Sequence, residues 1–514
     1  MLASLRASAL VLFFILFSLL EINTRLFAQE RLLYVFSNQE VQKDLDNLSS
    51  NPTIYQETPP LKKNGFGRLI TREFSHTPPQ KKFSWRHIFM PWRGSRSVDS
   101  NIITNSEPNS NDADRDLMED AQYVETIQAM DQLRTGQANV KPWSDDYWAY
   151  YRGGAAARYA DPGFPNSQSW QVNSKYISQN PFYIFFPSGK INSLSATEKY
   201  DLLYDRTAGM LTASSWADGA SYFKETGNVE TWMGLCHGWA PASYLAPRPK
   251  RAVDVIAFDG RTTIRFYPSD IKALTTLLWA NTRLNILSAG GRCNERSPRT
   301  DAVGRTVNPD CRDTNPSTWH RAIVNRLGLN RRSFIMDSTW DYQVWNQPLI
   351  SYRYRYFNPR TNSLSPNLKS AALHISQMGG DRLARYRARG VNFIVGISME
   401  VTYGMEKSPD HRENDGPEFD QIRTVLYNYD LELNSTGVVI GGEWHKKLHP
   451  DFIWTPTKDS RPVTQNDLSI SGEALWDGKS SIPNHWKQHA RNAAGHGQPL
   501  SKIIDSLNSL SEGR

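Results

Sequence analysis

Cys236 is the residue of this sequence with the clearest potential for covalent chemistry. It stands in the run Thr231-Trp-Met-Gly-Leu-Cys-His-Gly-Trp-Ala240. Pro241 is tolerated in a helix only within the first turn, so Cys236 is expected at or just before a helix N-terminus. That end of a helix lowers the pKa of a thiol and directs backbone N–H groups at a developing oxyanion. The sequence therefore predicts a nucleophilic thiolate, with a small buried apolar residue as the alternative.

A nucleophilic thiol needs an imidazole and a group that orients it. His320 begins an alternating run over residues 319–327, which favours a strand, and residues 328–332 resemble a turn. Residues 333–340 would then return as the partner strand and carry Asp337. In such a hairpin, His320 and Asp337 lie across from each other and share a hydrogen bond. We therefore predict the triad Cys236, His320 and Asp337.

Two other residues compete for these roles. His237 is a rival base, although adjacent residues on a helix point about 100° apart. Asp341 is a rival orienting carboxylate. A Cys at a helix N-terminus, followed by His and then Asp on adjacent antiparallel strands, is the plan of the papain-like and transglutaminase-like core. The predicted fold is therefore α+β: the helix bearing the Cys packs on an antiparallel sheet bearing His and Asp, with additional β-hairpins.

Other elements of the chain follow from hydrophobic periodicity and capping signals. Ser195 and Glu198 form a capping box, so a helix begins there. Ser269 is expected to cap a second helix, over residues 270–282. Buried or alternating apolar runs predict strands at residues 391–403, 424–433 and 438–444, and the last two read as a hairpin.

The composition is that of an exported globular protein. The chain has 514 residues, 39% of them hydrophobic, which excludes wholesale disorder. Residues 9–20 form an apolar run of signal-peptide length, and cleavage after Ala28 gives a signal peptide over residues 1–28, with an uncleaved anchor as the alternative. The net charge of +7 is spread over the whole chain, so we expect no nucleic-acid partner. The expected location is secreted, or periplasmic and cell envelope.

Three further regions follow the signal peptide. Residues 29–142 are irregular and form a possible pro-segment. Residues 143–460 are expected to form the catalytic domain, and residues 461–514 a polar C-terminal tail. Apolar patches at residues 31–36 and 83–92 suggest that the N-terminal region masks the Cys236 cleft until it is cut within residues 106–116, although a spacer away from the cleft is an equal alternative.

Two further cysteines and two acidic clusters lie outside the predicted triad. Cys293 and Cys311 flank a polar loop and are expected to form a disulfide, which leaves Cys236 as the odd thiol of an exported protein. Alternating aspartates at 112, 114 and 116, and a second acidic cluster over residues 413–420, could bind calcium. Neither completes an EF-hand loop, and solvated loops explain both. The metal site is therefore left unassigned.

Four motifs together resemble the transglutaminase elicitor family, whose best known members are oomycete cell-wall enzymes with bacterial relatives. The motifs lie at residues 194–203, 232–242 and 311–320, and at Val344-Trp-Asn-Gln-Pro348. The resemblance implies a Cys–His–Asp protein-glutamine γ-glutamyltransferase, reported as calcium-dependent in the oomycetes. It carries the motif residues over to Cys236, His320 and Asp337. After Pro348 this chain departs from the peptide that plants perceive.

The predicted reaction joins a protein glutamine to a lysine or a small primary amine by an isopeptide bond, through a thioester on Cys236. Tunnel walls of Trp232, Trp239 and Trp340 would shield this thioester from water, although ordinary packing explains each of them too. A cysteine protease or protein deamidase with the same triad is the alternative enzyme. A non-catalytic protein that binds the cell wall or envelope is the alternative outside enzymes.

Overall fold

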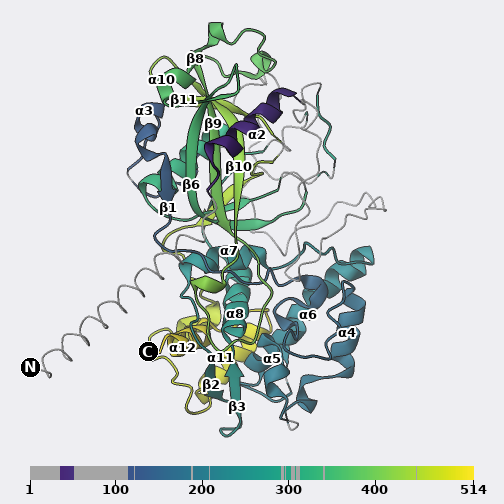
Figure 1. The fold of residues 1–514 in the computed structure, drawn as a ribbon. Coiled ribbons are helices and arrows are strands. Elements are labelled where there is room, and N and C mark those ends of the chain that lie inside the picture. The colour runs from purple at the N-terminus through teal and green to yellow at the C-terminus, as the bar shows by residue number, and fades with distance from the viewer. Residues whose placement is uncertain are drawn as a thin grey trace, which may run out of the picture.

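The protein folds into two lobes, a large antiparallel sheet and a helical lobe beneath it (Figure 1). This computed structural model describes residues 35–50 and 114–513, apart from residues 121, 187–188, 208, 291–294, 296, 302–306, 308–312, 340–341 and 447. The signal peptide and the Cys293–Cys311 disulfide lie outside the described residues. Helix α7 (Cys236–Leu245) lies where the two lobes meet (Figure 1).

The sheet follows the order β11-β10-β9-β6-β5-β12-β4, and short strands β1, β7 and β8 pair with its long members. Among the described residues, the strands of this sheet pair antiparallel. Its strands are β1 (Thr135–Gln137), β4 (Ile286–Ala289), β5 (Ile335–Asp337), β6 (Asn346–Asn358), β7 (Ser363–Ser365), β8 (Leu373–His374), β9 (Phe393–Gly404), β10 (Ile422–Leu433), β11 (Val439–Trp444) and β12 (Ile453–Pro456).

The helical lobe surrounds α7 and its neighbour α8, and a separate hairpin of β2 (Val253–Ile256) and β3 (Thr263–Phe266) closes its far end. Its other helices are α4 (Trp170–Gln179), α5 (Ala196–Asp201), α6 (Met210–Thr226), α8 (Pro268–Asn281), α11 (Asn484–Ala494) and α12 (Ser501–Glu512). The helices on the sheet are α2 (Asn38–Ser50), α3 (Ile127–Met130), α9 (Pro316–Ile323) and α10 (Leu368–Ala371). The described residues contain no helix that is both long and apolar enough to cross a membrane.

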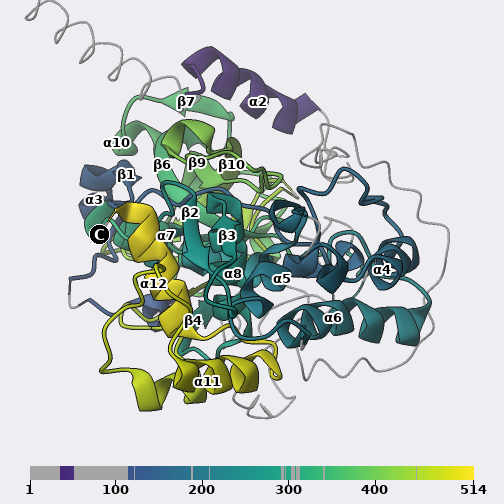
Figure 2. The same ribbon diagram turned by 90° about the horizontal axis from the view of Figure 1, so that it is seen from below.

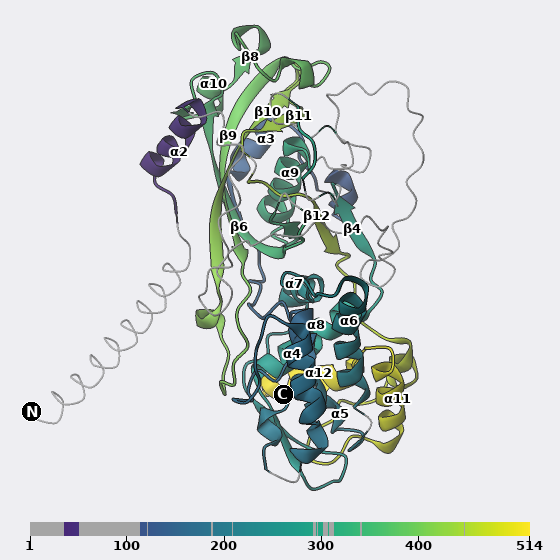
Figure 3. The same ribbon diagram turned by 90° about the vertical axis from the view of Figure 1, so that its right-hand side faces the viewer.

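The two faces of the sheet carry different helices because side chains alternate along each strand. Tyr354 and Tyr356 of β6 pack in the cluster that contains α9, whereas Phe357 packs against Val41 and Leu45 of α2. Figure 3 shows α2 on one side of the long strands and α9 on the other. The apolar patch at residues 31–36 was expected over the Cys236 cleft. Its described end, Phe36, instead packs with α2 on the outer sheet face, and residues 83–92 lie outside the described residues.

Several sequence predictions are confirmed. The strands expected at 391–403, 424–433 and 438–444 are β9, β10 and β11, and the last two pair as a hairpin. The capping box forms as expected, because the Ser195 side chain accepts from the Glu198 backbone and Glu198 bonds back to Ser195. The helix expected from residue 270 begins two residues earlier, at Pro268, with Tyr267 rather than Ser269 as its N-cap.

The strand predicted over residues 319–327 is wrong. Residues 316–323 form α9, and residues 324–329 continue as a π-helix. The Asn315 side chain accepts from the backbone of Ser317, and Pro316 occupies the first helical position. These are ordinary helix-start signals. They outweighed the alternating pattern, so His320 lies on a helix and not on the sheet.

The segments on either side of residues 143–460 pack against the two lobes. Strand β1 and helix α3 precede residue 143 but belong to the sheet lobe, since β1 pairs with β6. The segment expected as a polar tail folds onto the helical lobe, where Trp486, Ile503 and Leu507 are buried in the main core. Figure 2 shows α11 and α12 packed along this lobe. Apolar spacing within a polar composition was enough to anchor both helices.

Candidate active site

Cys236 is the first residue of α7, as the sequence predicted. Its thiol is free and buried, with 5% of the residue exposed. The side chain packs in a small cluster with Trp143, Trp239 and Trp279. The thiol therefore lies in an apolar setting at the positive end of a helix, where a charge on sulfur would depend on its few polar contacts.

Two glycines allow this helix to start where it does. The backbone N–H of Leu235 donates to the Tyr147 carbonyl at 2.6 Å, and a Cβ on Gly234 would collide with that same carbonyl. A Cβ on Gly238 would collide with the Thr276 carbonyl of α8. The run Gly-Leu-Cys-His-Gly therefore lets the chain pass close to two backbones on either side of the nucleophile.

The thiol makes two polar contacts with the segment that leads into β6. Asn346 donates from Nδ2 to the Cys236 Sγ at 3.3 Å, and the sulfur lies 3.8 Å from the Val344 carbonyl oxygen. The Asn346 Oδ1 in turn accepts from Trp454 Nε1 at 2.7 Å, which fixes the orientation of the amide. A donor held in this way stabilises a sulfur that carries negative charge.

Asp337 lies at the end of β5 and is register partner to Asn346. Its carboxylate is buried, and Oδ1 accepts from the Thr339 backbone at 3.2 Å, the Thr339 hydroxyl at 3.0 Å and the Trp345 backbone at 2.9 Å. These bonds hold Asp337 on the same side of the β5–β6 pair as the residues that touch the thiol. The structure thus brings Cys236 and Asp337 into one site.

Burial is the largest influence on the thiol and raises the pKa of Cys236. The hydrogen bonds from Asn346 lower this pKa, whereas the negative charges of Glu406 and Asp337 raise it further. The sequence expectation of a lowered pKa is therefore wrong for this closed arrangement. In the free protein the thiol remains protonated at neutral pH.

The described contacts of His320 are with tyrosines of the sheet. Its ring packs edge-on against Tyr354 and Tyr429, and Nδ1 is 2.8 Å from the Tyr429 hydroxyl. Nε2 has no hydrogen-bond partner among the described residues. The expected bond to Asp337 is therefore not formed. Burial lowers the pKa of His320 to about 3, so the imidazole is neutral.

Of the two rival residues, the structure describes His237 but not Asp341. His237 lies against the backbone of Ala280 and Gly234, and burial lowers the pKa of its imidazole to about 4. The Ala280 contact belongs to α8, on the helical side of α7. Asp341 and Trp340 lie outside the described residues.

An aromatic rim lies beside the thiol. Glu230 accepts from Trp232 Nε1 at 2.6 Å and from the Tyr342 hydroxyl at 2.9 Å, which ties the loop before α7 to the loop before β6. The rings of Tyr147 and Trp345 are 5.4 Å apart. Of the expected tunnel walls, Trp232 is part of this rim, whereas Trp239 is buried packing that donates to the Trp143 carbonyl.

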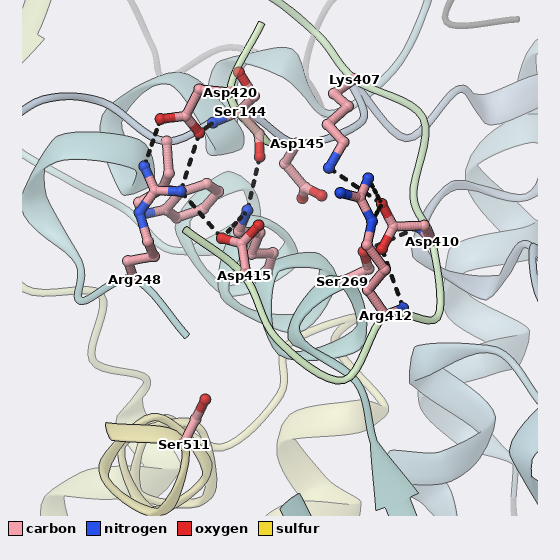
Figure 4. Close-up of polar contacts among 12 residues, drawn as sticks. Ser144, Asp145, Arg248, Ser269, Lys407, Asp410, Arg412, Asp415, Asp420 and Ser511 are labelled. Carbon is pink, nitrogen blue, oxygen red and sulfur yellow. Dashed lines mark hydrogen bonds and ion pairs between the residues drawn. The ribbon is translucent and has the colours of Figure 1, made fainter. Parts of the chain in front are cut away.

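The second acidic cluster is paired with protein cations. Asp415 lies 3.0 Å from Arg248 and 2.8 Å from Lys272, and Asp420 lies 2.7 Å from Arg248. Figure 4 shows Arg248 between the two aspartates. Among the described residues, no three His, Cys, Asp or Glu side chains are grouped so as to hold a metal ion. Because its oxygens are used on Arg248 and Lys272, the pair Asp415 and Asp420 does not fit a calcium site, and the side chains at 112, 114 and 116 lie outside the described residues.

Sequence reasoning missed two members of the site, Asn346 and Glu406. Asn346 lies inside the motif at residues 344–348, which gives no local sign that its amide reaches the thiol. Glu406 follows the end of β9 and has no local signal, because the pairing of β9 with β6 brings it to Gln347.

The protein is therefore of the mixed α+β class, with a cysteine at a helix N-terminus that faces a large antiparallel sheet. The model of the family described as Transglutaminase elicitor matches residues 118–472, and the chain belongs to this family. The crystal structure of the GP42 transglutaminase from Phytophthora sojae is similar to this chain at 19% identity and a TM-score of 0.44, covering 67% of this chain and 90% of that chain. A search of curated proteins found no match.

Proposed function

We propose that the protein is a protein-glutamine γ-glutamyltransferase in which Cys236 is the nucleophile. The observation that supports this most is the buried free thiol at the start of α7, whose sulfur accepts from an oriented amide of Asn346. Membership of the transglutaminase elicitor family supports the same activity. A purely structural cysteine would not need a polar donor held by a second residue.

In this reaction the Cys236 sulfur attacks the carboxamide carbon of a protein glutamine. The S–C bond forms, the C–N bond breaks, and the proton released from the thiol leaves with ammonia. A lysine amine then attacks the thioester, its N–C bond replaces the S–C bond, and its proton returns to the thiol. The first N–H groups of α7 and the Asn346 amide are positioned to stabilise the oxyanion of each step.

Two carboxylates, Asp337 and Glu406, are the charged groups that act on the thiol and the candidates for carrying these protons. His320, the general base that the sequence predicts, has no described contact with either Cys236 or Asp337, so we assign these proton transfers to the two carboxylates instead. The aromatic rim of Tyr147, Trp232 and Trp345 would keep water from the thioester, which favours an amine acceptor.

The same proposal extends to where the protein works. We propose that it is exported to the cell envelope or beyond and acts on proteins bearing glutamine and lysine. The apolar run at residues 9–20 and the low charge density of the chain support this assignment.

The experiment is incorporation of a fluorescent primary amine into a glutamine-bearing protein by the purified mature chain. Products are analysed by mass spectrometry for the amine adduct and for glutamate, with Cys236→Ala as the matched control. Incorporation that requires Cys236 supports the transferase. Formation of glutamate without the amine adduct would instead identify a deamidase, and cleavage of peptide bonds would identify a protease. A lack of turnover in the wild type as well as in Cys236→Ala would favour a binding protein.

A further inference from the structure

The connection between β9 and β10 crosses from the sheet to the helical lobe and returns. We call this segment, Met405–Gln421, the strap. At its far end the Asp410 backbone donates to Ser269 Oγ at 3.1 Å, and the Glu413 carbonyl accepts from the Ala252 backbone at 2.7 Å. Both partners belong to the helical lobe, so the strap joins the two lobes beside α7.

The strap is anchored by buried charge pairs. Arg248 forms a forked contact with Asp420, with bonds at 3.0 and 2.7 Å, and also bonds Asp415 at 3.0 Å. Lys272 bonds Asp415 at 2.8 Å and donates to the Ser144 carbonyl at 2.9 Å. Lys272 and Asp420 are almost fully buried, and forked arginine–carboxylate pairs fix geometry more strongly than single contacts.

One anchoring cation closely follows the nucleophile helix α7, and the other lies on α8, the helix packed against it. Arg248 follows the end of α7 by three residues, and Lys272 lies on α8, against which Gly238 of α7 packs without room for a Cβ. Ser144 precedes Tyr147, whose carbonyl holds the loop before Cys236. The position of the strap therefore depends on the same backbone and side-chain contacts that fix the position of Cys236.

The near end of the strap carries Glu406 to the start of β6, the strand whose first residue, Asn346, contacts the thiol. Its backbone is fixed on both sides, because Met405 donates to the Gln421 carbonyl and Lys407 to the Asp145 carbonyl, each at 2.8 Å. The Glu406 carboxylate accepts from the Gln347 amide, next to Asn346. Its charge is the largest acting on Cys236, followed by that of Asp337.

We propose that the strap places the Glu406 carboxylate at the Cys236 thiol, and that Arg248 and Lys272 are the positioning residues that hold it there without a bound divalent cation. The carboxylate oxygens of Asp415 and Asp420 form ion pairs with Arg248 and Lys272, so side chains of the protein itself hold the strap in place. The inference rests on the proposed function, since it gives Glu406 a role in the same thiol chemistry.

The test compares three variants of the full mature chain: Glu406→Gln, Arg248→Gln and the matched control Arg387→Gln. Arg387 forms a buried pair with Asp430 within the sheet lobe, so its loss destabilises the fold without touching the strap. For each variant we measure the pH profile of Cys236 labelling by iodoacetamide, kcat for amine incorporation, and Tm.

Glu406→Gln removes a negative charge near the sulfur, so the pKa of Cys236 falls and labelling at neutral pH rises by about threefold or more. The kcat should fall by roughly tenfold or more, because a carboxylate that carries a proton is lost. Arg248→Gln should change both quantities in the same direction, by smaller factors. Arg387→Gln should lower Tm and leave both within about twofold.

A wild-type labelling profile in Arg248→Gln would overturn the proposal, as would the same changes in Arg387→Gln. Labelling and turnover of the wild type should be equal in excess EGTA and in calcium chloride, and a requirement for calcium would overturn the claim that the strap closes without a cation. If the wild type labels but incorporates no amine, the proposed function fails, while the labelling profiles still decide the role of the strap.

Discussion

Helices α7 and α9 both carry a residue that the sequence assigned to catalysis, but they hold it in opposite ways. Cys236 is the first residue of α7 and faces the junction between the lobes. His320 is in the middle of α9, beneath the sheet, and its ring is enclosed by tyrosines. A helix terminus offers backbone donors and access to a second lobe, whereas the middle of a buried helix offers neither. Residue type alone did not distinguish the two settings.

The surroundings of the two side chains differ in polarity as well. The thiol has an oriented amide and two carboxylates acting on it, so its charge state can respond to a substrate. The imidazole has one tyrosine hydroxyl and a pKa of about 3, so it remains neutral at any ordinary pH. The contrast is between a thiol with polar contacts at the start of α7 and an enclosed neutral ring in α9, and four predictions can break or sharpen it.

The largest effect is expected at the start of α7. Cys236→Ala should lower amine incorporation by more than about 10⁴-fold, because the covalent step is lost. Turnover is measured on protein whose Tm matches the wild type. Residual activity near the wild-type level would remove Cys236, and with it α7, from the chemistry.

Asp337→Asn should come next, with kcat reduced by about 10²-fold or more, because a buried charge that acts on the thiol is removed. The amide keeps the size of the side chain, so Thr339 and Trp345 retain a partner for their N–H groups. Asp341→Asn is the control and should lose far less. Equal losses in the two variants would contradict the assignment of Asp337.

Asn346→Ala should reduce kcat by about 10²-fold, as loss of one oxyanion donor does. It also removes the hydrogen bonds that lower the pKa of Cys236. The iodoacetamide profile should therefore move to higher pH, opposite to the shift expected for Glu406→Gln. A profile that does not move would mean that the amide orients the backbone of β6 and not the sulfur.

The smallest effect on turnover is expected in α9. His320→Gln should leave kcat within about threefold but lower the free energy of unfolding by roughly 1–3 kcal/mol, because the Tyr429 hydroxyl loses its partner. The folded pKa of His320, about 3, lies below the ordinary value of 6.5. Its contribution to stability is therefore complete above pH 6.5 and is lost as pH falls toward 3.

Thermal unfolding of wild type and His320→Gln across this pH range measures that difference, which should shrink with acid. A kcat as low as that of Cys236→Ala would reinstate His320 as the general base and end the contrast between the two helices.

The sequence predicted those parts of the fold whose signals are local. The strands β9, β10 and β11, the capping box at Ser195 and the start of α7 each depend on a few adjacent residues. The α9 region failed because an alternating pattern competed with a cap at Asn315 and a proline at the first helical position. Both are visible in the sequence, and such start signals specify a helix more strongly than the alternating run over residues 319–327 specifies a strand.

The rest of the site could not be predicted for a different reason. Asn346 and Trp454 are far apart in sequence, and Trp454 orients the amide that contacts Cys236 only because β5 pairs with both β6 and β12. Glu406 depends on where the strap crosses between lobes. Such contacts are set by sheet register and lobe packing, which one sequence does not reveal.

One consequence concerns the epitope that the motif at residues 344–348 could present. In the folded protein Val344, Trp345 and Asn346 are at most 7% exposed, and Gln347 is not exposed at all. An antibody or receptor that reads this stretch as a linear peptide therefore has no access to it in the native state. Recognition of that kind would report denatured or fragmented protein, and an antibody raised to the free peptide would serve as a sensor of damage to the fold.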